Sequence, residues 1–228
     1  MRSIFVVSCL AAGLLPASIA VSAEPDPLAL YGPAATYEIL RNGEVVGEHR
    51  IDFSRQGDAL MVESRSQIEV PFLFLTGYAF EYRARTIWNN GTLIRLEAQT
   101  NDDGEQSSLM GERADDRMRI EGPSGDIAIP ADLPLSEHWS RRFIDGGRQL
   151  NTITGKVNDI EIRPLGEAFV PMANGIAQAE RFQVDGDIKL ETWYDEAGRW
   201  LGMRFAAQDS SIIEYRCRTC RADVADLP

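Results

Sequence analysis

The sequence has 228 residues, of which 44% are hydrophobic, and its 35 acidic and 23 basic residues give a formal net charge of −12 at pH 7. A surface this acidic repels phosphate backbones and anionic headgroups, so we expect no nucleic-acid partner and no electrostatic docking on a membrane. Only two histidines are present, which excludes a multi-histidine metal centre. Because glycine-rich phosphate loops and Gly-x-Ser-x-Gly are also missing, we predict no metal and no cofactor.

A secretory signal peptide is predicted over residues 1–23. Arg2 gives a positive start, an apolar run without acidic residues follows, and Val21-Ser22-Ala23 has the small-x-small pattern of a signal-peptidase site. The alternative is a retained membrane anchor, but Pro16 interrupts the run, which barely reaches the ~20 residues of a spanning helix. We therefore expect cleavage after this tripeptide, export to the periplasm, and a mature chain without a transmembrane segment.

The mature chain, residues 24–228, is interpreted as a single β-rich domain. Neither a proline- or serine-rich linker nor a charge block or repeat divides it. Turn signals recur about every ten to fourteen residues, which is typical of antiparallel strands joined by hairpins. These signals are Asn42-Gly43, Gly57-Asp58, Asn90-Gly91, Asp102-Asp103-Gly104, Gly122-Pro123, Asp185-Gly186 and Ala197-Gly198.

Between the turns, hydrophobicity alternates with a period of two, as in strands with one buried and one solvated face. The predicted inward residues of the first example are Val45, Gly47, His49, Ile51 and Phe53. The same pattern recurs at Leu60, Val62, Ile68 and Val70, at Ile94, Leu96 and Ala98, and in four later segments between residues 182 and 215. This pattern predicts an all-β, mainly antiparallel fold.

One predicted strand, residues 70–75, is apolar on both faces and contains Phe72 and Phe74. It runs into Tyr78 and Phe80. Such a strand needs cover on both sides. We consider two arrangements: a central strand beneath a helix or loop, and a surface that faces a hydrophobic ligand.

A short helix is predicted over residues 134–147, because Leu135, Trp139 and Phe143 recur every four residues, with Ser136 as a cap and a glycine pair as the stop. We interpret this helix as a lid or plug.

Both histidines have two interpretations. His49 is predicted to point inward, either as a core histidine bonded to a backbone carbonyl or tyrosine, or as a ligand contact or general base. His138 lies beside Glu137 and Trp139 and is either a helix-end residue or a histidine oriented by a carboxylate.

The mature chain has two cysteines, Cys217 and Cys220, and we predict that they form a disulfide in the oxidising periplasm. A continuous strand would separate their Cα atoms by ~10 Å, beyond the ~7 Å that a disulfide tolerates, so the chain must bend there. The Cys-x-x-Cys spacing also occurs in redox enzymes, but there it begins a helix in a βαβ unit. We interpret the bond as structural.

Four segments together resemble an uncharacterised family of exported bacterial proteins, domain of unknown function 6134. They are Tyr37–Arg50, Ser136–Trp139, Leu150–Gly155 and Trp193–Trp200. The resemblance covers essentially the whole mature chain, implies an exported protein and transfers no catalytic residue. The Cys-Arg-Thr-Cys tail is not part of the shared pattern.

More distantly, Tyr37–Gly47 and Trp193–Arg199 are similar to another uncharacterised envelope family, thought to share the half-open β-barrel of periplasmic lipoprotein carriers. This resemblance implies a strongly curved sheet or half-open β-barrel with one short helix as lid or plug.

The leading hypothesis is a non-catalytic protein that binds a lipid or other hydrophobic small molecule on its concave face. The predicted contacts are His49, Phe72, Phe74, Tyr78, Phe80, His138 and Trp139. The alternative is an interaction module for an envelope protein, and the third option is an enzyme with a dispersed carboxylate or histidine site. A structure separates the first two, because a small-molecule binder needs a cavity of several hundred Å3.

Overall fold

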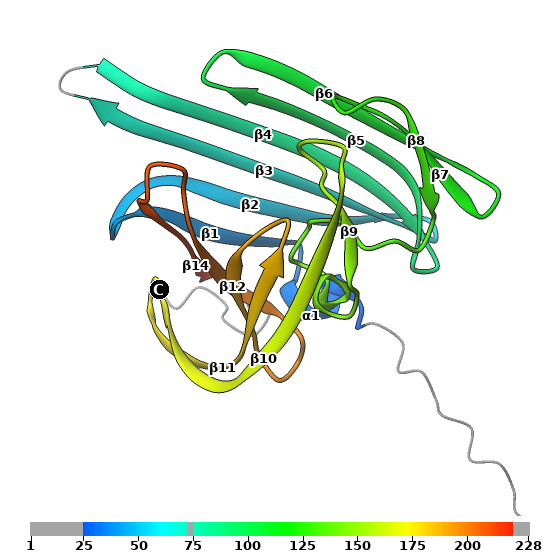
Figure 1. Ribbon diagram of the computed structural model, residues 1–228. Coiled ribbons are helices and arrows are strands. Elements are labelled where there is room, and N and C mark those ends of the chain that lie inside the picture. Colours follow the sequence, from blue (N-terminus) through cyan, green and yellow to red (C-terminus); the bar gives the residue numbers. More distant parts are fainter. Residues whose placement is uncertain (1–24, 73–74, 221–228) are drawn as a thin grey trace, which may run out of the picture.

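The computed structural model describes residues 25–72 and 75–220. These residues form fourteen β-strands, one short α-helix and one 3-10 helix (Figure 1). In chain order they are α1 (Pro27–Tyr31), β1 (Ala34–Arg41), β2 (Glu44–Gln56), β3 (Ala59–Phe72), β4 (Leu75–Asn89), β5 (Thr92–Asp102), β6 (Glu105–Ala114), β7 (Arg117–Glu121), β8 (Ile127–Pro130), η1 (Arg141–Ile144), β9 (Arg148–Leu150), β10 (Val157–Met172), β11 (Gly175–Gly186), β12 (Leu190–Tyr194), β13 (Trp200–Ala206) and β14 (Ile212–Thr219).

All fourteen strands belong to one sheet, in the order β8-β7-β6-β5-β4-β3-β2-β1-β14-β13-β12-β11-β10-β9. Each neighbouring pair is antiparallel, and every pair except β1 with β14 is consecutive in the chain. The sheet curves strongly without closing: β3 to β6 form a broad wing and β10 to β14 curl beneath it (Figure 1). The predicted antiparallel, all-β, half-open architecture is confirmed.

The hairpin turns form where Asn-Gly and Asp-Gly pairs predicted them. Asn42 and Gly43 both have positive φ, at 51° and 89°, as do Asn90 and Gly91, at 48° and 73°. Tight hairpins need this left-handed backbone, which asparagine and glycine adopt most readily. One predicted turn is displaced, because Asp185-Gly186 ends β11 and the chain bends at residues 187–188.

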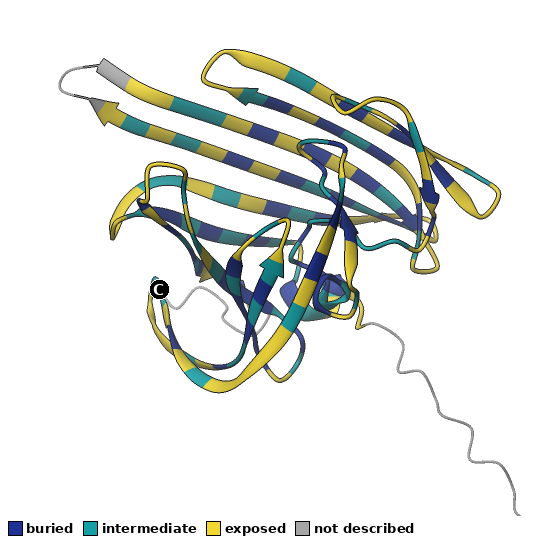
Figure 2. Cartoon of the chain, in the orientation of Figure 1, coloured by how far each residue is buried: buried dark blue, intermediate teal, exposed yellow. Residues whose placement is uncertain are grey.

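The alternation of buried and exposed residues is visible along most strands (Figure 2), but two predicted inward residues point outward. Val45 is 61% exposed, because the β1–β2 ladder slips by one residue after Ile39 and Val46 packs against the core instead. The β4–β5 ladder slips in the same way, so that Leu93 is buried in place of Ile94. A β-bulge inserts one residue and thereby reverses the faces beyond it.

The helix predicted over residues 134–147 is wrong. Leu135 pairs with Leu150 of β9 in a parallel bridge, Ser136 N–H donates to the carbonyl of Leu150, and Leu150 N–H donates to the carbonyl of Pro134. These backbone groups therefore serve the sheet edge and are not available for a helical ladder. Only the four residues of η1 are helical, with the Ser140 hydroxyl accepting from Arg142 N–H at their start.

The four-residue spacing nevertheless identified the buried side chains of this segment, because Leu135, Trp139 and Phe143 all belong to the core. The Trp139 ring lies 5.7 Å from the ring of Phe53 and 5.9 Å from that of Trp88. Segment 131–147, which joins β8 to β9 and includes η1, thus packs onto the inner face of β2 and β4 as an irregular plug.

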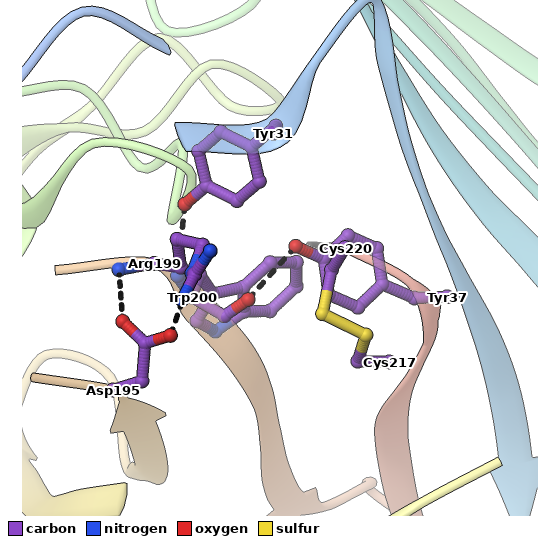
Figure 3. Close-up of a disulfide and its surroundings, with 7 residues drawn as sticks. All are labelled: Tyr31, Tyr37, Asp195, Arg199, Trp200, Cys217 and Cys220. Atoms are coloured by element: carbon purple, nitrogen blue, oxygen red, sulfur yellow. Dashed lines mark hydrogen bonds and ion pairs between the residues drawn. A yellow bond between two sulfur atoms is a disulfide. The ribbon is translucent and has the colours of Figure 1, made fainter. Parts of the chain in front are cut away.

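A second buried cluster joins the start of the domain to the β12–β13 hairpin (Figure 3). Tyr37 O–H donates to the carbonyl of Trp200 at 2.9 Å, and Trp200 N–H donates to the Tyr31 hydroxyl at 2.8 Å. The Asp195 carboxylate accepts from the backbone N–H and the guanidinium of Arg199 across the hairpin turn. The Trp-Tyr-Asp segment of the family resemblance therefore has a structural role.

Cys217 and Cys220 form the predicted disulfide, with Cα atoms 5.7 Å apart (Figure 3). The bend that it requires is a register shift in the β1–β14 ladder, where Thr36 pairs with Thr219 but Tyr37 pairs with Cys217. Both cysteines are buried, in agreement with a structural bond.

Candidate functional site: a cavity on the concave face

The concave face of the sheet holds a partly open cavity of about 940 Å3. Residues of β1 to β5, β9 and β12 to β14 line it, together with the plug segment 131–147. We call the part beside Glu137, His138 and Gln149 the closed end, because the plug covers it. The part beside Arg41, Lys189 and Asp209, which lie at or beside turns, is the mouth.

The cavity wall changes from polar to apolar along its length. Three inward-facing cross-strand pairs follow one another along the β3–β4 ladder towards the hairpin: Ser66 with Tyr82, Ile68 with Phe80, and Val70 with Tyr78. On the opposite wall, Met203, Phe205 and Ile213 continue the apolar surface. The alternation along each strand points these side chains into the cavity. Whether a cross-strand pair carries hydroxyl or aliphatic side chains determines how polar the wall is at that point.

His49 lies on the wall of the cavity in a polar and aromatic setting. Its Nδ1 is 2.7 Å from the Ser66 hydroxyl, and its ring makes edge contacts with Trp200 and Tyr215 at 5.9 and 5.6 Å. Burial lowers the pKa of His49 to about 4, so the ring is neutral at pH 7. It is thus a partly buried histidine on the cavity wall, bonded to a serine hydroxyl and not to a tyrosine.

His138 is stacked on Trp200 at 5.1 Å with an interplanar angle of 19°, and its ring lies 4.0 Å from that of Phe143. It is not a helix-end residue, because no helix forms there. Burial, with a smaller contribution from His49, lowers its pKa to about 3. Its Nδ1 is buried and has no hydrogen-bond partner in the structure.

Two polar residues of the closed end were not predicted. Glu137 is 9% exposed, and its Oε2 accepts from Trp139 Nε1–H at 2.8 Å while Oε1 has no partner. Burial raises the pKa of Glu137 to about 7, although the bond from Trp139 opposes the shift. Gln149 is 0% exposed, and neither its amide oxygen nor its nitrogen is hydrogen bonded. No spacing rule marks either residue, since both become neighbours of the cavity only through the pairing of β9.

Five of the seven predicted ligand contacts line the cavity: His49, Tyr78, Phe80, His138 and Trp139. Phe74 lies outside the described residues, and the side chain of Phe72 is likewise not described. Burial raises the pKa of Tyr78, and a hydrogen bond with Asp102 adds to the shift. The structure thus brings together residues from three distant parts of the sequence.

At the closed end the two histidines are neutral at pH 7, whereas Glu137, with a pKa of about 7, is about half ionised; the mouth carries an ion pair and a lysine. Arg41 forms an ion pair with Asp209, and Lys189 is exposed. Within residues 25–72 and 75–220, no three His, Cys, Asp or Glu side chains gather where they could hold a metal ion. None of the helices in these ranges has the length and hydrophobicity needed to cross a lipid bilayer.

The comparisons with known proteins agree with this architecture. Residues 37–218 match the family model described as Domain of unknown function (DUF6134). The chain belongs to this family. The match confirms the resemblance drawn from four segments, and it places the disulfide partner Cys220 just beyond the DUF6134 domain. No sequence among the curated proteins matches.

A solved structure resembles that of this DUF6134 protein. It is a beta-barrel-like protein of domain of unknown function DUF1849 from Brucella abortus, with a TM-score of 0.54 and 9% sequence identity. The similarity covers 81% of this chain and 94% of the other. At this identity the likeness shows the shared fold alone.

Proposed function

We propose that this protein binds an elongated, largely apolar molecule such as a lipid within the cavity of its concave face. The cavity of about 940 Å3 carries this proposal. Its volume lies near the upper end of the ~300–1,000 Å3 of small-molecule sites. Protein interiors are otherwise packed with few voids larger than a water molecule.

The partly exposed apolar side chains on the cavity wall give the ligand its binding energy. Ile68, Phe80, Met203 and Phe205 are packed against the core but only partly buried. Completely burying one such side chain is worth ~1.5 to 3 kcal/mol. A bound alkyl chain that covers several of them therefore offsets the entropy lost on binding.

The first experiment is a titration with N-phenyl-1-naphthylamine, a neutral apolar dye, followed through dye and tryptophan fluorescence. Because Trp139 and Trp200 both line the cavity, saturable binding should change both signals. A Trp139→Phe variant separates the contributions of the two indoles. Unsaturable dye binding, together with no displacement by any lipid, would count against the proposal.

Two matched substitutions locate the site. Phe80→Asp places a charge on the cavity wall, whereas Phe169→Asp places the same charge on β10 at a side chain that is 79% exposed and outside the cavity. We expect Phe80→Asp to weaken dye binding at least tenfold. Phe169→Asp should leave it unchanged. Equal effects would move the binding site away from the cavity.

The β10–β11 hairpin favours a second candidate function, an interaction module for an envelope protein. Phe169, Pro171 and Ile176 lie on one face of this hairpin, because Pro171 and Ile176 pair directly and Phe169 is two residues from Pro171. Phe169 and Ile176 are 79% and 74% exposed. A cluster of exposed apolar side chains is a recognised mark of a protein contact. Crosslinking in the native compartment tests this candidate: the crosslinked complex should be lost with Phe169→Asp and kept with Phe80→Asp.

We further propose export to the periplasm with cleavage after Ala23. The support is the charge and hydrophobicity pattern of residues 1–23, which lie outside the described part of the chain. N-terminal sequencing of the periplasmic protein should give Glu24 as the first residue. A periplasmic chain that still begins at Met1 would contradict the proposal.

A further inference from the structure

We infer that the closed end of the cavity binds an uncharged, hydrogen-bonding head group, so that the ligand lies with its head inside and its apolar chain towards the mouth. This inference rests on the proposed function and names the chemical class of the ligand: a long-chain alcohol, amide or acylglycerol.

The first observation is a concentration of unpaired polar atoms. Five buried side-chain nitrogen or oxygen atoms of the described residues lack a hydrogen-bond partner, and four belong to side chains that line the closed end. They are Glu137 Oε1, His138 Nδ1, and both amide atoms of Gln149. Buried polar groups are nearly always paired, because an unpaired one loses its hydration without compensation. A ligand head group supplies the missing partners.

The Gln149 amide lies just beneath the cavity surface. Gln149 borders the cavity although none of its surface is accessible to water, with an exposed fraction of 0%. The fifth unpaired atom, Nδ2 of Asn158, lies on the direct cross-strand partner of Gln149. A small rotation of the flexible Gln149 side chain brings its amide to a head group seated above it.

The second observation is the distribution of charge. Among the described residues that line the cavity, the cations are Arg41 and Lys189, and both lie at the mouth, where Arg41 is paired with Asp209. Burial keeps His49 and His138 neutral at pH 7 by lowering the pKa of each ring. A carboxylate or phosphate at the closed end would lose its hydration and meet the partly ionised Glu137 in place of a counter-charge, which is strongly unfavourable. An ammonium would meet only a carboxyl group that is half protonated at pH 7, and it would lose its own hydration as well.

The donors and acceptors at the closed end suit a hydroxyl or amide. The Gln149 amide donates and accepts, the neutral His138 ring offers one nitrogen, and hydroxyls of Ser136, Ser66 and Thr152 line the same region. Beyond them, the Ile68–Phe80 and Val70–Tyr78 pairs provide an apolar wall for the chain. Because the polar side chains line the closed end and the apolar pairs lie towards the mouth, the head group binds at the closed end and the alkyl chain extends towards the mouth.

The test compares three ligands that share one alkyl chain: monopalmitoylglycerol, palmitate and hexadecylamine. Each displaces N-phenyl-1-naphthylamine from the full-length mature protein near neutral pH. We expect monopalmitoylglycerol to bind at least tenfold more tightly than palmitate and hexadecylamine. Tighter binding of palmitate or of the amine, or equal binding of all three, overturns the inference and leaves the proposed function standing. Failure of all three to displace the dye contradicts the proposed function itself.

A pair of matched variants assigns the preference to Gln149. Gln149→Leu removes an amide that has no partner in the protein, so the fold is retained, because replacing an unpaired polar group by an apolar one is not destabilising. We expect it to weaken monopalmitoylglycerol binding about tenfold more than it weakens dye binding. Gln183→Leu, outside the cavity with its amide bonded to the carbonyls of Val184 and Leu190, should keep the preference. If Gln149→Leu also keeps it, Gln149 does not contact the head group and the inference fails.

Discussion

Replacing Glu137 by glutamine should make the protein more stable, and the gain should grow with pH. Burial raises the pKa of Glu137 from its ordinary value of 4.5 to about 7. Well below pH 4.5 the carboxyl group is protonated in both the folded and the unfolded chain. As pH rises from 4.5 towards 7, only the unfolded chain loses the proton, so the wild type loses stability across this window. Glutamine does not titrate and avoids the loss.

The expected size of the gain follows from the shift. At about 1.4 kcal/mol per pKa unit, the rise to about 7 corresponds to about 3 kcal/mol of unfolding free energy above pH 7. The two histidines of the cavity titrate alike in both proteins, so their contribution cancels in the difference. Glutamine also keeps an oxygen that accepts from Trp139 Nε1–H, as Glu137 Oε2 does.

Urea titrations at a series of pH values, followed by tryptophan fluorescence, measure this difference. The matched control is Glu69→Gln, on the exposed side of β3, which should shift stability by less than about 0.5 kcal/mol at every pH. A constant difference between Glu137→Gln and wild type from about pH 4 to pH 8 would refute the reasoning, because it would mean that the Glu137 carboxylate is hydrated or paired in solution.

Three further predictions follow from the described contacts. His138→Phe should protect the protein against acid. Burial lowers the pKa of His138 to about 3, so the wild type loses stability as pH falls below 6.5, whereas the variant has no ring nitrogen to protonate and its ring fits between Phe143 and Trp200. Urea titrations of both proteins from neutral to acidic pH measure the difference. Trp200→Ala should lower the free energy of unfolding by ~3 to 5 kcal/mol, because the indole is fully buried in the core; an unchanged urea midpoint would contradict that. Replacing Cys217 and Cys220 by serine should retain the circular-dichroism spectrum. It should lower the free energy of unfolding by about 2 kcal/mol, the low end of the usual ~2 to 4 kcal/mol, because the closed loop is small. Loss of a dithiol-exchange activity in the variant would instead identify a redox role.

The strands and most hairpins could be predicted from the sequence because both depend on local rules. Alternating side chains mark a half-buried strand, and Asn-Gly marks a tight turn. The errors at Val45 and Ile94 come from β-bulges. A bulge depends on the partner strand across the ladder, so a pattern within one strand does not reveal it.

In the plug segment the sequence predicted which side chains are buried but not the backbone conformation. The spacing of Leu135, Trp139 and Phe143 correctly marked three core residues, but two backbone bonds between residues 134–136 and Leu150 hold the chain extended. These bonds depend on a strand that comes later in the sequence. Tertiary pairing therefore overrides the local helical pattern.

Of the candidate site, only the aromatic and histidine side chains could be predicted from the sequence. Runs such as residues 70–80 are conspicuous because apolar residues fall on both faces. Glu137 and Gln149, by contrast, are single polar residues that any solvated loop or strand could contain. Their importance arises from burial beneath the sheet, which depends on the topology of all fourteen strands.

The strand order also bears on how the chain folds. Among the strands of the described residues, twelve ladders join strands that are consecutive in the sequence, and only β1 with β14 joins distant ones. We therefore expect the two local meanders, β1 to β8 and β9 to β14, to form early and the long-range ladder between them to close late, which slows folding. A circular permutant that starts at β9, joins residue 220 to residue 25 through a linker and ends just before β9 would keep every described ladder and make all of them local.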